Sequence, residues 1–446
     1  MKNDNLIQRD LNHFWHPCSQ MKDYETFPPE IITHAEGSLL YRQDGPPLID
    51  TISSWWCKSL GHRHPTIQKA VHRQMEKFEH VILANTTNGT IVDLVEKICD
   101  MHPDYQKVFF ADSGSDTVEV AVKMSLQYHA QTGHPEKKNF LSLENGYHGE
   151  TILTLALGDC DLYSKPFASL MPKVPRNHSI PYCTGIDDPL WKDMGEERWA
   201  IIEKQLEAQR EELAAIVFEP LIQGAGGMLI YSADFLTRLR KWTEQNNVHL
   251  IADEIMTGLG RAGHARACEW ADIVPDFSVF SKGLTAGFCP MAAVVTTNKI
   301  YEAFYDDYET GKAFMHSNTY CGNAIAAAAA LGAFQVYEEE QTFARVRRDE
   351  QYLKDLFKYI HQETGCLKNI RGLGFVTAAE LTRPDGTDFP SDKRMGYTIY
   401  QEAVKRGALL RPLGNTMYFL PPLNTPKNLL EQSAEIAIAS IKAVLG

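Results

Sequence analysis

Two charged residues stand at the points where apolar, strand-like segments end. The run His249-Leu-Ile-Ala leads into Asp253, and the run Ser278-Val-Phe-Ser leads into Lys282. A lysine that is partly desolvated at a strand end has a lowered pKa and can attack a carbonyl as an amine nucleophile. A carboxylate nearby can keep a heteroaromatic nitrogen protonated, which makes the ring an electron sink. On these two residues alone, a buried Asp–Lys ion pair or ordinary strand-end charges are the better interpretation.

A third strand-like segment, residues 107–111, leads into a turn of small residues that includes Gly114 and Ser115. A helical pattern follows, and the N-terminus of a helix offers backbone N–H groups and the positive end of its dipole to a phosphate. Gly114 and Ser115 are the expected donors, and Asp116 with Glu119 resembles a capping pair. An ordinary, well-capped turn between a strand and a helix would give the same pattern.

A fourth strand end carries an aromatic residue, in the sequence Asn145-Gly-Tyr147-His-Gly149. An aromatic side chain in this position can stack on a planar ring, although Tyr147 could equally be a wall residue that packs against the sheet. A phosphate cradle, a stacking aromatic, an acid for a ring nitrogen and a nucleophilic lysine, all at strand ends, form a chemically coherent set. Chance assembly of all four is much less probable than any one of them.

Short apolar segments alternate with helical patterns between about residues 85 and 300. The expected strands cover residues 107–111, 140–143, 215–219, 249–254, 278–281 and 292–296, and the expected helices include residues 117–131, 199–212 and 233–246. This alternation predicts βαβ units and an α/β fold with a mostly parallel sheet covered on both faces. Ligands of such sheets bind at the carboxyl ends of the strands, where the four features above are found.

The chain length and pattern predict a large domain flanked by a smaller one. We expect residues 63–330 to form the large cofactor-binding domain, and residues 1–62 and 331–446 to form a smaller α+β domain from both ends. Residues 158–197 interrupt the alternation, because they are rich in Pro, Asp, His and Lys. They predict a long irregular excursion near the site.

The bulk composition excludes several classes of protein. A net charge of −13 over 446 residues argues against a nucleic-acid binder, which would carry a basic stripe. The nine cysteines are scattered without a C-x-x-C pair, which is typical of reduced thiols in a cytoplasmic protein. The N-terminus lacks the apolar core of a signal peptide, and the alanine-rich residues 324–334 are too few to span a bilayer. We therefore expect a soluble, cytoplasmic protein.

Two other patterns could indicate a different kind of site, namely a dinucleotide site or a metal site. The stretch Gly258-Leu-Gly260-Arg-Ala-Gly263 matches G-x-G-x-x-G and would suit an NAD(P)-dependent oxidoreductase. A dinucleotide site should open a helix and be followed by an acid about 20 residues later, which this stretch does not predict. The histidines His62 and His64 lack the further ligands of a metal site, so no metal is expected. A non-catalytic binding protein is a further alternative, but it would not need the Lys, Asp and Tyr set.

The segment that contains Asp253 and Lys282 resembles the class III (omega-type) aminotransferases. It reads Ile251-Ala-Asp253-Glu254-Ile-Met-Thr-Gly258-Leu-Gly260-Arg261-Ala-Gly263, with Lys282-Gly283 following 29 positions after Asp253. The resemblance covers nearly the whole chain. It implies pyridoxal 5′-phosphate as the cofactor, the fold type I architecture and a homodimer that binds small-molecule substrates, with no nucleic-acid or membrane partner.

The resemblance also implies roles for individual residues. Lys282 would carry the cofactor as a Schiff base and shuttle a proton, Asp253 would pair with the pyridine nitrogen, and Tyr147 would stack on the ring. Gly114 and Ser115 would bind the phosphate, and Thr319 would add a phosphate contact across the dimer interface. The substrate pocket would be lined by Tyr147 and Lys282 together with Trp55, Ser317 and Arg411, with Arg411 as a candidate clamp for a carboxylate.

Within this family, further segments resemble the branch that aminates 8-amino-7-oxononanoate in biotin synthesis. They include Trp15-His16-Pro17, Ser53-Ser54-Trp55-Trp56, Gln223-Gly-Ala-Gly-Gly227 and Leu410-Arg411-Pro412-Leu413-Gly414. Cys18 and Glu150 depart from the Tyr and Asp usual in that branch, so the amino donor stays open between S-adenosylmethionine, which we favour, and lysine. The nearest alternative is another omega-amino acid aminotransferase of class III.

Overall fold

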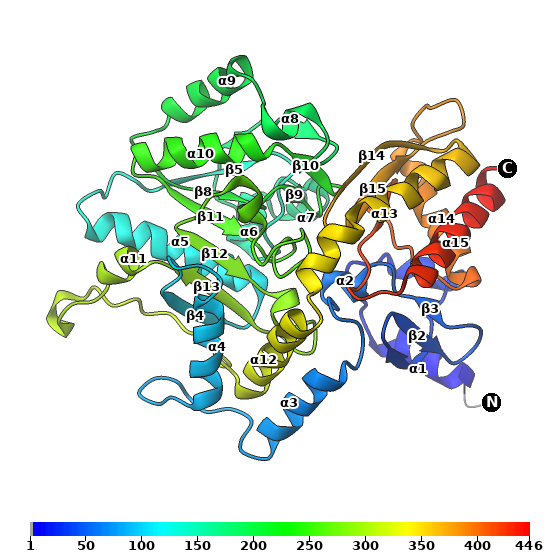
Figure 1. The fold of residues 1–446 in the computed structure, drawn as a ribbon, viewed down its shortest axis with the longest axis horizontal. Helices are drawn as coiled ribbons and strands as arrows, with labels where there is room; N and C mark the ends of the chain where they lie inside the picture. Colours follow the sequence, from blue (N-terminus) through cyan, green and yellow to red (C-terminus); the bar gives the residue numbers. More distant parts are fainter. Residues whose placement is uncertain (1–2) are drawn as a thin grey trace.

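The structure is a computed structural model that describes residues 3–446. At its centre lies a seven-stranded sheet with strand order β4-β13-β12-β11-β8-β5-β6 (Figure 1). The strands are β4 (Lys107–Ala111), β5 (Asn139–Leu143), β6 (Arg176–Asn177), β8 (Leu213–Phe218), β11 (His249–Asp253), β12 (Phe277–Phe280) and β13 (Ala292–Thr296). Only β13 runs antiparallel to its neighbours, which are β12 and β4. The prediction of an α/β fold with a mixed, mostly parallel sheet is confirmed.

Helices bury both faces of this sheet. They are α3 (Pro65–Met75), α4 (Gly89–Cys99), α5 (Gly114–Gln131), α9 (Glu196–Glu207), α10 (Ala233–Gln245) and α12 (Ala324–Glu339). Along β8, Ala215 and Val217 pack with α5, whereas Ile216 and Phe218 belong to the apolar cluster that includes α10. Because successive side chains of a strand point to opposite faces, α5 and α10 cover opposite sides of the sheet.

The two ends of the chain lie together at one side of the large sheet (Figure 1). One small sheet is formed by β1 (Ile32–Glu36), β2 (Leu39–Arg42) and β3 (Leu48–Ile49), and another by β14 (Leu367–Leu373), β15 (Val376–Leu381) and β16 (Thr416–Phe419). The helices of this region are α1 (Asn3–His13), α13 (Thr342–Thr364), α14 (Met395–Arg406) and α15 (Lys427–Leu445). The expected smaller α+β region from both termini is therefore present, and we retain boundaries at residues 62 and 330 as a proposal.

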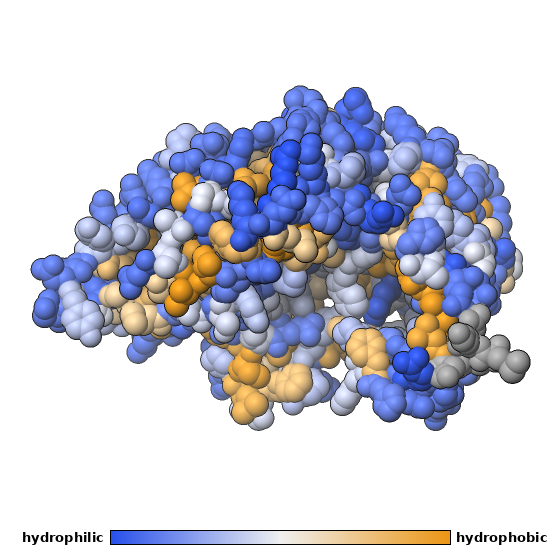
Figure 2. Space-filling model, turned by 90° about the horizontal axis from the view of Figure 1, so that it is seen from below, coloured by the Kyte–Doolittle hydropathy of each residue, from blue (hydrophilic) through white to orange (hydrophobic). Residues whose placement is uncertain are grey.

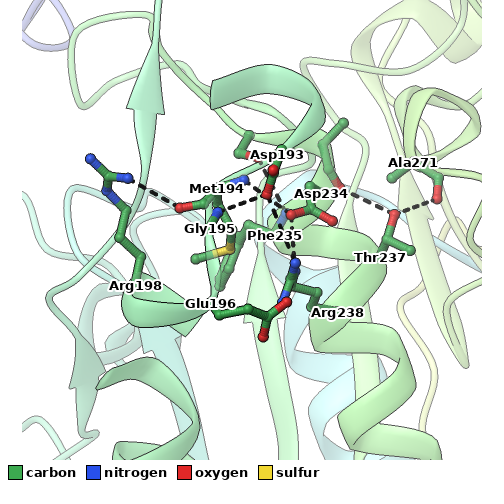
Figure 3. Close-up of polar contacts among 12 residues, drawn as sticks. Asp193, Met194, Gly195, Glu196, Arg198, Asp234, Phe235, Thr237, Arg238 and Ala271 are labelled. Carbon is green, nitrogen blue, oxygen red and sulfur yellow. Dashed lines mark hydrogen bonds and ion pairs between the residues drawn. The ribbon is translucent and has the colours of Figure 1, made fainter. Parts of the chain in front are cut away.

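Residues 158–197 contain only short elements, among them α7 (Asp161–Ser164), β7 (Tyr182–Cys183) and α8 (Pro189–Lys192). Polar contacts fix the end of this excursion to α10 (Figure 3). Arg238 Nε lies 2.9 Å from Asp234 Oδ2 and its Nη1 lies 2.8 Å from Glu196 Oε1, while Asp234 Oδ2 also accepts a 3.1 Å hydrogen bond from Met194 N. The excursion is thus anchored at its C-terminal end.

The alanine-rich residues belong to α12, which packs against α3 and α4 in the main apolar core. Within residues 3–446, no helix combines the length and the apolar character needed to cross a membrane.

Candidate active site

Lys282 is the first residue of the short 3-10 helix η4 (Lys282–Thr285), which is separated from β12 by Ser281 alone. Its Nζ lies 5.0 Å from the centroid of the Trp56 ring. Burial lowers the pKa of the Lys282 ammonium, and the carboxylates of Asp253 and Glu219 oppose this shift. The amine of Lys282 therefore loses its proton at a lower pH than the amine of an exposed lysine.

Asp253 is the last residue of β11 and is almost completely buried. The imidazole of His148 lies against it, with 2.9 Å between His148 Nδ1 and Asp253 Oδ2. The other carboxylate oxygen accepts a 3.2 Å hydrogen bond from the backbone N–H of Ile255. His148 and the backbone N–H of Ile255 thereby fix the orientation of this carboxylate.

A second buried carboxylate, Glu219, follows β8 and was not among the predicted site residues. It accepts 2.9 Å hydrogen bonds from the backbone N–H groups of Tyr147 and Gly224. Burial raises the pKa of Glu219 to about 7, and the charge of Asp253 adds to the rise, while His148 and the two N–H donors oppose it. The same signal that singled out Asp253, an apolar strand that runs into an acid, could have identified Glu219.

The expected phosphate cradle lies at the N-terminus of α5. The first N–H groups of a helix have no partner within it, and here they belong to Gly114 and Ser115. The predicted start and cap of this helix were wrong: α5 begins at Gly114, and Ser113 is the capping residue. The Ser113 hydroxyl accepts from the backbone N–H of Asp116 at 3.3 Å and donates to its carboxylate at 2.8 Å. Because the capping residue is Ser113 and not Asp116, the first N–H groups without a partner in the helix lie three residues earlier in the chain.

Comparison with known proteins decides the family. The sequence profile described as "Aminotransferase class-III" matches residues 20–441. The chain belongs to the class III aminotransferases. It is 37% identical to the adenosylmethionine-8-amino-7-oxononanoate aminotransferase of Helicobacter pylori, over 94% of this chain and 93% of that protein. It is 35% identical to the enzyme of the same name from Geobacter sulfurreducens, over 93% and 92% of the two chains.

Solved structures agree with this assignment. The adenosylmethionine-8-amino-7-oxononanoate aminotransferase of Methanocaldococcus jannaschii superimposes with a TM-score of 0.90 at 27% identity, covering 99% of both chains. An omega transaminase of Pseudomonas jessenii, in complex with PMP, gives a TM-score of 0.89 at 25% identity and covers 98% of both chains. The enzyme is therefore a transaminase that depends on pyridoxal phosphate, as predicted.

The residues of this aminotransferase fit that cofactor. His148 Nε2 is buried and has no hydrogen-bond partner within residues 3–446, beside the carboxylate that would meet a ring nitrogen. Gly149 has a φ of 128°, and a Cβ at this position would overlap the side chain of Ser115. Only glycine lets the chain pass this close to the N-terminus of α5, where a phosphate would be bound.

Tyr147 projects from the turn that carries Gly149. Its hydroxyl donates a 3.0 Å hydrogen bond to Glu150 Oε1, and its ring meets that of Tyr163 edge to face, with 5.7 Å between centroids. Burial raises the pKa of Tyr147, and the neighbouring carboxylate of Glu150 adds to the rise. Its backbone N–H is held by Glu219, so two carboxylates orient the ring.

Trp55 and Arg411 form a cation–π pair, with 4.6 Å between the guanidinium carbon and the ring centroid. Arg411 Nη2 also donates a 2.7 Å hydrogen bond to the carbonyl of Cys18. In the described part of the chain, no carboxylate lies within ion-pair distance of Arg411. The guanidinium therefore keeps donors for an anionic ligand.

Ser317 and Thr319 are exposed in the segment between η5 (Tyr308–Thr310) and α12. The neighbouring Tyr320 N donates to Asp112 Oδ2 at 3.4 Å. The segment therefore lies beside the turn that follows β4, and no hydrogen bond within residues 3–446 joins Ser317 or Thr319 to Lys282.

The glycine-rich stretch from Gly258 to Gly263 does not open a helix. It forms a tight turn in which Gly260 and Gly263 have positive φ, and the next element, η3 (Ala267–Ala271), is a short 3-10 helix. Arg261 is buried and donates to the carbonyls of Phe375 and Pro421 at 3.1 and 2.7 Å. The stretch therefore connects the large sheet region to the C-terminal part of the chain through Arg261, and the dinucleotide interpretation is wrong.

The raised pKa of Glu219 predicts a pH-dependent stability. The folded protein binds this proton up to about pH 7, whereas the ordinary pKa of a glutamate side chain is 4.5, so the folded state holds more protons than the unfolded state between these limits. Stability is therefore lost as pH rises from about 4.5 to 7. Glu219→Gln removes this titration, and we expect its melting temperature relative to wild type to increase from pH 5 to pH 8. An exposed control, Glu302→Gln, should show a constant difference; an equally constant difference for Glu219→Gln would contradict the assignment.

Proposed function

We propose that this aminotransferase transfers an amino group to the 7-keto group of 8-amino-7-oxononanoate and forms 7,8-diaminononanoate in biotin synthesis. The agreement among the relatives carries the proposal, since those from bacteria and from an archaeon bear the same enzyme name. The free donors of Arg411 beside Trp55 support it, because the substrate ends in a carboxylate that a guanidinium fork binds well.

The site residues have distinct parts in this proposal. Gly114 and Ser115 bind the phosphate of the cofactor through the N-terminus of α5, and Tyr147 stacks on its ring. When bound, pyridoxal phosphate supplies an electron sink for negative charge on the substrate carbon that carries the amine. Asp253, oriented by His148, keeps the ring nitrogen protonated.

Lys282 moves the proton in this reaction. Because burial favours its neutral form, Lys282 Nζ can accept the proton that leaves the amine-bearing carbon of the donor. Trp56 covers the amine on one side, at 5.0 Å from its ring centroid. The donor and the keto substrate react in turn, in two half-reactions at the same lysine.

We further propose that the enzyme is a homodimer in the cytoplasm. Thr319 and Ser317 are exposed, which would allow them to contact the site of a partner chain. Large apolar side chains are also exposed, among them Trp15, Ile82, Leu162 and Met315. Figure 2 shows apolar patches on an otherwise hydrophilic face, as expected for a surface that another chain covers.

The amino donor in our proposal is S-adenosylmethionine, and lysine is the alternative. Both departures from the branch pattern lie on the same side of the site, with 4.0 Å between Cys18 Sγ and Glu150 Oε1. The relatives' names mention adenosylmethionine, which favours that donor. The likeness to omega transaminases favours a second candidate function, transfer from an omega-amino acid to pyruvate.

Product analysis tests the function. Purified enzyme with pyridoxal phosphate and 8-amino-7-oxononanoate should form 7,8-diaminononanoate, detected by mass spectrometry, when S-adenosylmethionine is added. Formation only with lysine would change the donor and keep the keto substrate. No product with either donor, together with turnover of an omega-amino acid and pyruvate, would refute the biotin-pathway proposal in favour of the second candidate.

Substitution of the lysine tests the mechanism. Lys282→Ala removes the proton-transfer group, and we expect kcat to fall by about 10²- to 10⁴-fold. Cofactor affinity should be partly retained, because the phosphate and ring contacts remain, and equilibrium dialysis can measure it. The exposed Lys299→Ala serves as the matched control and should keep wild-type activity. Undiminished transamination by Lys282→Ala would rule out the assigned role.

A further inference from the structure

The segment from Ser53 to Trp56 forms one turn of left-handed helix without a glycine. The φ angles of its four residues are 50°, 45°, 71° and 70° in chain order. Helix-like hydrogen bonds close the turn, from Trp56 N to the carbonyl of Ile52 at 2.8 Å and from Cys57 N to that of Ser53 at 3.0 Å. Residues with a side chain disfavour this conformation, so its surroundings must hold it.

This turn determines where two tryptophans point. Trp55 lies against the guanidinium of Arg411, and Trp56 lies against Lys282 Nζ. Trp56 Nε1 also donates a 3.0 Å hydrogen bond to the hydroxyl of Tyr418. In a strand or a right-handed turn, the two successive rings could not keep these same positions relative to Arg411 and Lys282.

The buried carboxylate of Asp50 holds the middle of the turn. It is 0% exposed, and its Oδ1 accepts a 2.8 Å hydrogen bond from the backbone N–H of Ser54. Oδ2 accepts a 2.8 Å bond from the Ser54 hydroxyl and lies 3.0 Å from His62 Nε2. Both oxygens of one carboxylate are thus committed to one residue of the turn, with His62 as the third partner.

The start of the turn is held separately. The Ser53 hydroxyl donates to the carbonyl of Leu420 at 2.7 Å, and Arg261 Nη2 donates to the Ser53 oxygen at 3.3 Å. Arg261 also binds the carbonyl of Pro421, so the first residue of the turn is fixed to the segment after β16. Asp50 is therefore the polar group that controls the next residue, Ser54, and through it the path of the backbone into Trp55.

We propose that Asp50 is a positioning residue for substrate binding in this enzyme. Its carboxylate holds Ser54 in the left-handed conformation and thereby places Trp55 beside Arg411 and Trp56 beside Lys282, with His62 orienting the carboxylate. The inference rests on the proposed function in one respect, namely that Arg411 and Trp55 receive the carboxylate of the substrate. Asp50 itself touches neither substrate nor cofactor in this account.

Conformational rescue distinguishes this role from general structural support. Asp50→Asn keeps the size of the side chain but loses the oxygen that accepts from Ser54 Oγ and His62. Ser54→Gly, added to it, removes the cost of positive φ at the residue that Asp50 holds. If Asp50 serves to maintain this conformation, the double variant should regain what the single variant lost.

Asp385→Asn is a matched control. Asp385 also accepts from the backbone N–H and the hydroxyl of one residue, Thr387, at 2.9 and 2.6 Å, but it lies on an exposed loop. It should behave as wild type in every measurement. Melting temperatures of all variants identify a general loss of stability; if Asp50→Asn does not fold, Ser54→Ala, which keeps the backbone bond to Asp50, replaces it.

Hydrogen–deuterium exchange of the cofactor-free protein measures the turn directly. We expect the peptide that covers residues 52–58 to exchange about tenfold faster in Asp50→Asn and to recover in the double variant with Ser54→Gly. In steady-state assays, Asp50→Asn should lower kcat/KM for 8-amino-7-oxononanoate by about 100-fold, mainly through KM, with partial recovery in the double variant.

Two results would overturn the proposal: unchanged exchange of residues 52–58 in Asp50→Asn, or a double variant no better than Asp50→Asn in both measurements. A wild-type enzyme that fails to aminate 8-amino-7-oxononanoate would instead count against the proposed function. The exchange experiment needs neither cofactor nor substrate, so the two failures remain distinguishable.

Discussion

The active site depends on lowering the pKa of one amine that lies among buried acids. Burial lowers the pKa of Lys282, yet Asp253 and Glu219 lie close enough that both charges act to raise it. The structure reconciles these opposing effects through Glu219, whose pKa of about 7 keeps it partly protonated, and through His148, which engages Asp253. The parallel arrangement makes this possible, because β8, β11 and β12 all end on the same side of the sheet and place the three side chains at their carboxyl-terminal ends.

Much of this arrangement could be predicted from the sequence. The apolar segments between residues 107 and 296 appear as strands of the central sheet, because strands buried on both faces need continuous apolar sequence. The start of α5 could not be read correctly, since Ser113 with Asp116 and Asp116 with Glu119 have the same spacing. Only the folded backbone reveals that Ser113 is the capping residue.

Other features had no signal that local rules could detect. The sequence Ser-Ser-Trp-Trp contains neither Gly nor Asn, so nothing in it predicts four left-handed residues at about 1–2 kcal/mol each. Of the partners that hold this turn, Asp50 and His62 are near it in the sequence, whereas Arg261 is 208 residues from Ser53. Arg261 also explains the glycine-rich stretch, whose turn brings a buried guanidinium to the segment after β16.

The visible absorption spectrum of the purified protein tests the central claim, which is that Lys282 binds pyridoxal phosphate and that the bound cofactor reacts with an amino donor. Addition of the cofactor to wild type should produce a visible band that is absent in Lys282→Ala, and S-adenosylmethionine or lysine should bleach it. A band of the same position and intensity in Lys282→Ala, or no band in wild type, would contradict the account.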